Sequence, residues 1–97
     1  MSEKEERKKA HLMAQKADQY IGAIHRKLTR ILKDPEYYKH VTKIKKEVKD
    51  FPKAQRIAEK AEYYLDIFLN PTLEKYEKGV YKRILEFKKR MHKLATV

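Results

Sequence analysis

The apolar residues of this 97-residue chain recur at steps of three and four, which is the spacing of one helix face. The pattern predicts four helices, at about residues 3–33, 35–50, 53–69 and 71–95. Each has a single apolar stripe, and in the last helix the stripe consists of Leu73, Tyr76, Val80, Ile84, Phe87, Met91 and Leu94. Nothing alternates with the period of a strand, so the sequence predicts an all-α fold.

The helices are separated by three prolines, Pro35, Pro52 and Pro71. Proline is favoured in the first turn of a helix and costs ~3 kcal/mol or more in its interior. Asp34 and Asn70 each precede one of these prolines, and both side chains are preferred N-caps. Ser2 and Glu5 have the spacing of a capping box at the start of the first helix. We therefore expect Asp34 and Asn70 to act as caps and not as ligands.

Short connections favour antiparallel neighbours, so we expect a single domain, residues 1–97, folded as a compact antiparallel up-down helical bundle. The bundle has four helices, or three if Pro52 only kinks a continuous helix. In the four-helix form the first and last helices are antiparallel. Gly22 and Gly79 then lie at similar heights, where they either allow a close approach of the two backbones or occupy exposed positions.

Composition agrees with a helical, folded chain. Charged residues make up 40% of the sequence and hydrophobic residues 41%, with only 2 glycines. The periodic apolar residues argue against disorder. The chain has no cysteine, and no apolar run approaches the ~20 residues that cross a bilayer. The expected compartment is the cytoplasm.

The net charge of +11 favours polyanion partners such as nucleic acid, although it also keeps a small protein soluble. Residues 1–33 and 71–97 each carry +5, whereas residues 34–52 carry +1 and residues 53–70 carry zero. An antiparallel bundle would join the two ends of the chain in one phosphate-binding pole, made of Arg7, Lys8, Lys9, Lys82, Arg83, Lys88, Lys89, Arg90 and Lys93. A secondary basic cluster ends the first helix, at Arg26, Lys27, Arg30 and Lys33.

The alternative function is a protein-interaction adaptor, or a subunit of a larger assembly, in which the basic charge is incidental. Four tyrosines fall on apolar stripes and are expected in the core: Tyr20, Tyr38, Tyr64 and Tyr76. The other three are expected to be exposed and available to a partner: Tyr37, Tyr63 and Tyr81.

Few residues suggest catalysis, and we expect a non-enzymatic protein without a cofactor or metal. No two of the four histidines are three or four residues apart, and there is no glycine-rich phosphate loop. Glu36 and His40 lie one turn apart, but two ligands do not make a metal site. Ser2, the one serine, lies at the start of the sequence, where a nucleophile has no supporting groups.

Two segments carry a family resemblance. Tyr64-Leu65-Asp66-Ile67-Phe68-Leu69-Asn70-Pro71-Thr72-Leu73 resembles the Tyr-Tyr-Leu-Pro-Thr-Thr-Leu helix junction of the 5-bromo-4-chloroindolyl phosphate hydrolysis (XpaC-like) proteins. Tyr20-Ile21-Gly22-Ala23-Ile24-His25-Arg26 is similar to the Tyr-Ile-x-x-Ile-Arg helix of that family. The proline here comes one residue later than in the family pattern. The resemblance, over about residues 15–80, implies a helical fold and brings no catalytic residues with it.

Overall fold

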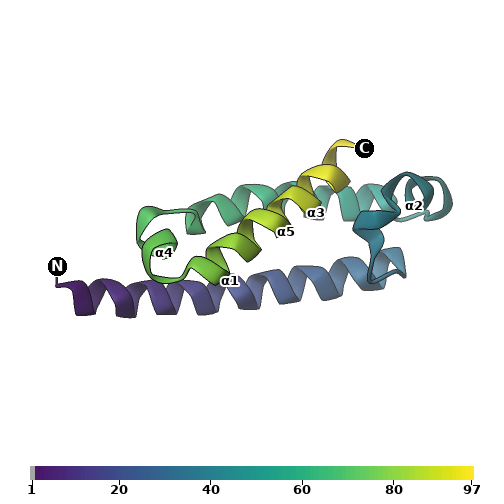
Figure 1. Cartoon of the computed structure of the whole chain (residues 1–97). Coiled ribbons are helices and arrows are strands. Elements are labelled where there is room, and N and C mark those ends of the chain that lie inside the picture. Colours follow the sequence, from purple (N-terminus) through teal and green to yellow (C-terminus); the bar gives the residue numbers. More distant parts are fainter. Residues whose placement is uncertain (1) are drawn as a thin grey trace.

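A computed structural model describes residues 2–97, and within them it contains helices and no strand (Figure 1). The all-α prediction is confirmed. The elements, in chain order, are α1 (Glu3–Leu32), the 3-10 helix η1 (Tyr37–Lys39), α2 (Val41–Glu47), α3 (Phe51–Leu65), the 3-10 helix η2 (Asp66–Phe68), α4 (Pro71–Tyr76) and α5 (Lys78–Thr96).

Local hydrogen bonds explain where the helices begin and end. The Ser2 side chain accepts a bond from the Glu5 backbone N–H at 3.3 Å, which caps α1. The Asn70 side chain accepts from the Leu73 N–H at 3.0 Å, so its predicted role as an N-cap is confirmed. α1 ends at Lys33, whose φ of 57° is in the left-handed region typical of helix C-termini.

Asp34 does not cap an α-helix as predicted. Its side chain accepts a bond from the Glu36 N–H at 2.9 Å, two residues on, which is the geometry of an Asx turn. The chain then enters η1 and not a long helix. The predicted helix at 35–50 is therefore replaced by η1 and the seven-residue α2, which both serve as a connection between α1 and α3.

Two backbone breaks set the number of helices. Val48 is extended after α2, and Pro52 lies in the first turn of α3, so α2 and α3 are separate helices and not one kinked helix. Glu77 interrupts the predicted last helix with φ −135° and ψ 57°, between α4 and α5. The result is three long helices, α1, α3 and α5, with two short ones.

The long helices do not have the predicted directions. α1 and α5 run the same way, with α3 opposite to both (Figure 1). His11 of α1 pairs with Glu77, the residue just before α5, and Asp18, further along α1, pairs with Arg83 of α5, so both helices advance in the same direction. The antiparallel pairing of the first and last helices is therefore wrong. The prediction is wrong because α2 and α4 act as connectors. Only α1, α3 and α5 run the length of the bundle, so the third of these helices runs in the same direction as the first.

The glycines accordingly do not allow a close helix approach. A Cβ atom built on Gly22 meets only the Arg26 guanidinium, at 3.4 Å, and one on Gly79 meets only that of Arg83, at 4.0 Å. Both neighbours belong to the same helix as the glycine. Gly79 is exposed, as the alternative expected, whereas Gly22 is half-buried.

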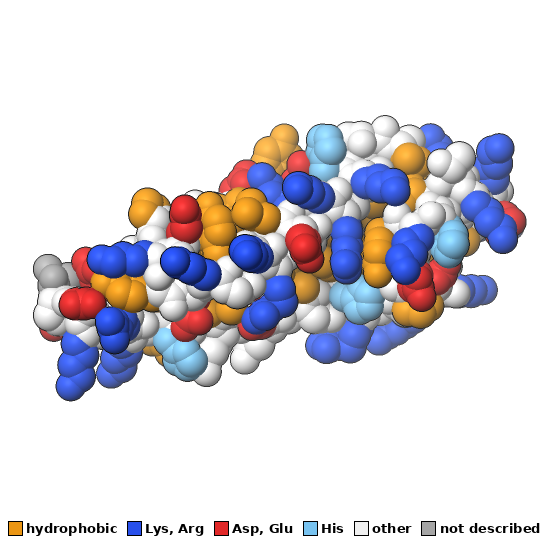
Figure 2. All heavy atoms as spheres, viewed as in Figure 1, with side chains coloured by type: hydrophobic (Ala, Val, Ile, Leu, Met, Phe, Trp, Pro, Cys, Tyr) orange, Lys and Arg blue, Asp and Glu red, His pale blue; other side chains and the backbone are white. Residues whose placement is uncertain are grey.

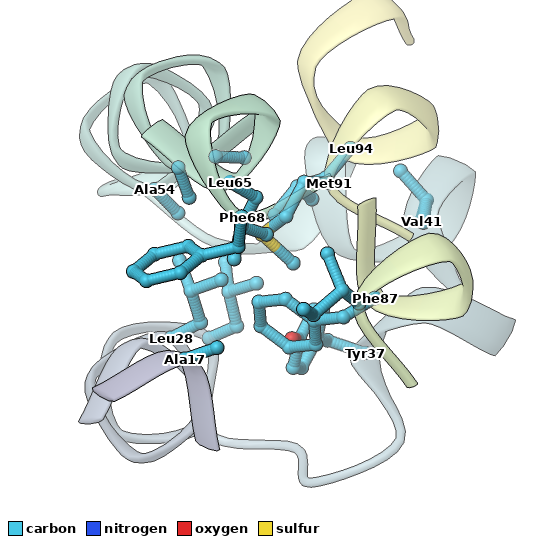
Figure 3. Close-up of a cluster of buried hydrophobic side chains, with 14 of the residues drawn as sticks. Ala17, Leu28, Tyr37, Val41, Ala54, Leu65, Phe68, Phe87, Met91 and Leu94 are labelled. Atoms are coloured by element: carbon cyan, nitrogen blue, oxygen red, sulfur yellow. The ribbon is translucent and has the colours of Figure 1, made fainter. Parts of the chain in front are cut away.

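The core lies between the three long helices and continues under η1 and η2 (Figure 3). Alanines on α1 and α3 leave room for the larger side chains of α5, including Phe87, Met91 and Leu94. Every residue classed as buried is hydrophobic among those that the structure describes. The molecule is elongated, with extents of 52 × 20 × 18 Å. In a molecule of this length, the two ends can differ in net charge.

Candidate nucleic-acid interface

Three of the six predicted basic residues of the last helix are held by other parts of the fold. Arg83 donates to both Asp18 carboxylate oxygens, Nε to Oδ1 at 3.2 Å and Nη2 to Oδ2 at 2.9 Å. This bond raises the pKa of Arg83, with the charge of Asp18 adding to the effect. Lys88 forms an ion pair with Asp66 in η2. The Arg90 guanidinium lies 4.0 Å from the centroid of the Tyr38 ring.

The other three, Lys82, Lys89 and Lys93, are exposed and have no ion pair with the residues that the structure describes. Spacings of seven and four place them on one face of α5. Glu86 lies between Lys82 and Lys89 on the same face, so it reduces the positive charge there. The unpaired charge is therefore concentrated toward the C-terminal part of α5.

Arg7, Lys8 and Lys9 do not join this part of α5, contrary to the prediction. Because α1 and α5 are parallel, the start of α1 lies near the start of α5. Lys9 and Lys27 are separated along α1 by 18 residues, or about 27 Å, which is roughly three Debye lengths at physiological salt. Arg7 is also paired locally, with Glu3 at 3.0 Å.

The structure instead brings the secondary cluster, Arg26, Lys27, Arg30 and Lys33, to the same end of the molecule as the C-terminal part of α5. The Arg90–Tyr38 contact connects α5 to the segment that follows α1. Gln55, in α3, donates to the backbone oxygens of Leu94 and Ala95. This end is thus formed by the second half of α1, α2, the start of α3 and the end of α5 (Figure 1).

We call this part of the molecule, residues 24–58 and 88–97, the basic end. It carries fifteen Lys and Arg residues and four Asp and Glu residues, whereas the rest of the chain carries ten of each. The basic end therefore carries a net charge of +11 and the rest of the chain a net charge of zero, although Asp66 and Glu62 of the rest pair with Lys88 and His92 of the basic end. Figure 2 shows one face of the molecule, where Lys and Arg side chains predominate over a few acidic ones at the end that includes α2, and both signs are mixed near the N-terminal end.

The predicted tyrosine surface is only partly present. Tyr63 is 73% exposed, as expected, whereas Tyr37 is fully buried and Tyr81 is half-buried against the core. Sequence reasoning missed Ile67, which is 62% exposed one turn after Tyr63, and Tyr64, which is 46% exposed although it was expected in the core. Both lie where α3 ends and η2 begins. A 3-10 helix turns by a different angle per residue, so the apolar spacing of a regular α-helix does not predict which side chains are exposed there.

The structure gives no metal centre within residues 2–97, where no group of three or more His, Asp and Glu side chains converges. Glu36, one of the two candidate ligands, forms an ion pair with Lys39 at 2.7 Å. In the same part of the chain, none of the helices has the length and apolar character that a membrane crossing requires.

Comparisons with protein-family models, with curated proteins and with solved structures find no match for this chain. The resemblance to XpaC-like proteins therefore stays a prediction, and function has to be argued from the charge and the geometry described above.

Proposed function

We propose that this chain is a small, non-enzymatic, up-down helical bundle that binds nucleic acid or another polyanion through phosphate contacts at its basic end. The cytoplasm is the expected compartment. The observation that supports this function best is the location of the whole net charge of +11 in residues 24–58 and 88–97. A neutral opposite end means that solubility alone does not account for the pattern, since charge spread over the surface would serve that purpose equally well.

Phosphate contacts of this kind carry no sequence information. The basic end consists of helix sides and turns, and its cations lie over α1, α2, α3 and α5 and not on one helix that could enter a major groove by itself. We therefore expect affinity to be nearly independent of base sequence. Lysine, which makes up most of the unpaired positive charge on α5, suits this role because its ammonium acts as a point charge.

Two variants with equal changes in charge test the location of the interface. The first replaces Lys27, Lys89 and Lys93 of the basic end by Gln, and the second replaces Lys4, Lys8 and Lys9 of the opposite end by Gln. All six side chains are exposed and have no ion pair with the described residues, so both variants should keep the fold. Binding to a random-sequence duplex is measured by fluorescence anisotropy at low salt.

The proposal predicts that the first variant binds more weakly by tenfold or more, and that the second stays within about threefold of the unmodified protein. Equal losses in the two variants would mean that binding depends on net charge alone. That result would contradict a defined interface at the basic end.

The adaptor function remains the second candidate, because the structure exposes apolar side chains beside the basic end. Tyr63 and Ile67 are one turn apart, and Leu85 on α5 is 38% exposed. Exposed apolar patches of this kind mark protein interaction sites when they are contiguous. If the unmodified protein no longer binds duplex or single-stranded DNA at physiological salt, the adaptor function becomes the better account, and Tyr63→Ser with Ile67→Ser is then the variant to compare in binding to a purified partner.

A further inference from the structure

One cation of the basic end differs from the rest in how it is held. The guanidinium of Arg90 lies over the Tyr38 ring at 4.0 Å, and Tyr38 packs edge-to-face on Tyr37, with ring centroids 5.6 Å apart and an interplanar angle of 87°. Tyr37 is fully buried. The stack therefore rests on the core, and Arg90 is positioned by an aromatic ring and not by a carboxylate. Among the described residues, no ion pair to Arg90 is present.

A small hollow lies beside Arg90, on the seam between α1 and α5. It has a volume of about 160 Å³ and is lined by Ile21, Arg83, Glu86, Phe87 and Arg90. Apolar groups of Ile21 and Phe87 are thus combined with two guanidinium groups and one carboxylate. Arg83 is oriented by its two bonds to Asp18, so its guanidinium has a defined place beside the hollow. A hollow of this size suits one planar ring and not a peptide segment.

We propose that the basic end binds single-stranded nucleic acid in preference to duplex, with one unpaired base entering this hollow, which adjoins the basic end at Arg90, and stacking against Arg90. The proposal rests on the function proposed above and adds the class of nucleic acid. Guanidinium planes and aromatic rings stack with bases, and they do so without base preference because every base has a π-face. The carboxylate of Glu86 provides an acceptor for an N–H group on the base edge.

A duplex cannot use the hollow in this way, since its bases are already stacked and paired. It keeps the phosphate contacts of the surrounding lysines and arginines. Single strands gain one stacked base, which by itself contributes a factor of about 5 to 150 in affinity. The preference should therefore be visible at equal salt and equal phosphate number.

The decisive variant is Arg90→Lys, which keeps the charge and removes the planar group. Binding of oligo(dT) of about 12 nucleotides is compared with binding of a random duplex that presents a similar number of phosphates. We expect Arg90→Lys to weaken oligo(dT) binding at least fivefold and to change duplex binding less than twofold. The matched control is Arg7→Lys, the same substitution outside the basic end, which should change both by less than twofold. Thermal unfolding shows whether each variant is folded.

A second variant, Tyr38→Leu, leaves Arg90 without the ring on which it rests, and it should weaken oligo(dT) binding with the same selectivity. The inference is overturned if Arg90→Lys weakens both nucleic acids equally, or leaves oligo(dT) binding unchanged, while duplex binding by the unmodified protein persists. If the unmodified protein binds neither nucleic acid even at low salt, the proposed function itself fails, and the two failures are thus distinguishable.

Discussion

The hydroxyl group of Tyr37 allows a prediction whose sign is opposite to that of most core substitutions. The side chain is fully buried, and its oxygen has no hydrogen-bond partner in the part of the chain that the structure describes. A buried polar group without a partner costs ~1–3 kcal/mol relative to the same group in water. Replacing Tyr37 by Phe removes that cost and keeps the ring in the core. We expect the free energy of unfolding to rise by about 1 kcal/mol or more at neutral pH.

The effect should grow at alkaline pH. Burial raises the pKa of Tyr37 from 10.0 to about 12, with Arg90 opposing the rise and Tyr38 adding to it. In the unfolded chain the phenol loses its proton near its ordinary pKa, whereas in the folded protein it stays protonated until higher pH. Ionisation of Tyr37 therefore does not affect stability below pH 10.0, and it lowers the free energy of unfolding of the unmodified protein as the pH rises toward about 12, a loss that Tyr37→Phe does not show. Two pKa units correspond to about 2–3 kcal/mol at most.

Urea unfolding of the unmodified protein and of Tyr37→Phe, at neutral pH and at two alkaline pH values, tests both parts. In thermal unfolding, a stabilisation of 1 kcal/mol should raise Tm by roughly 4–8 °C in a domain of this size. Tyr63→Phe is the control, because Tyr63 is 73% exposed and should change stability by less than about 0.5 kcal/mol. If Tyr37→Phe lowers the unfolding free energy by 1 kcal/mol or more, the hydroxyl has a partner and our account of this site is wrong.

Three further predictions concern the helices, and urea unfolding measures each. Asn70→Ala should lower stability by ~0.5–2 kcal/mol without changing nucleic-acid affinity, because Asn70 caps α4 through the Leu73 N–H; an affinity loss at unchanged stability would contradict a purely capping role. Gly79→Ala should raise stability by up to about 1 kcal/mol, since Gly79 is the second residue of α5 and the added methyl group meets nothing closer than 4.0 Å; a decrease would show that the backbone there is not helical. Gln55→Ala should lower stability by about 1 kcal/mol, because its amide bonds the last carbonyl groups of α5, and an unchanged midpoint would refute that contribution.

Much of the helical structure could be predicted from the sequence because it depends on local physics. The spacing of apolar residues predicts α1 at about residues 3–33, and the observed helix spans Glu3–Leu32. Asn70 before Pro71 predicts a cap that the structure contains. These features follow from side chains within a few residues of each other, and no distant contact is needed to decide them.

The direction of α5 and the location of the charge could not be predicted in the same way. They depend on whether the segments around residues 35–50 and 71–76 are full members of the bundle or connectors. No proline marks the break at Glu77 in the sequence. Residues 37–39 form the 3-10 helix η1, whose rotation per residue differs from that of an α-helix, so Tyr37 and not Tyr38 is fully buried. Because these two segments form connectors and not long helices, the first and last helices run parallel and not antiparallel. The basic clusters of α1 and α5 therefore meet at one end, although the residues that make up each cluster were identified from the sequence.

The salt dependence of nucleic-acid binding tests the central claim most directly. For a duplex, the slope of log K against log salt is about −0.9 per phosphate contacted. Replacing Lys27, Lys89 and Lys93 by Gln should therefore make the slope less negative by up to about 2.7, whereas replacing Lys4, Lys8 and Lys9 should leave it nearly unchanged. Micromolar binding that persists at physiological salt, with this difference between the two variants, is the result that our account predicts. The same slope in both variants, or binding already absent at physiological salt, would contradict it.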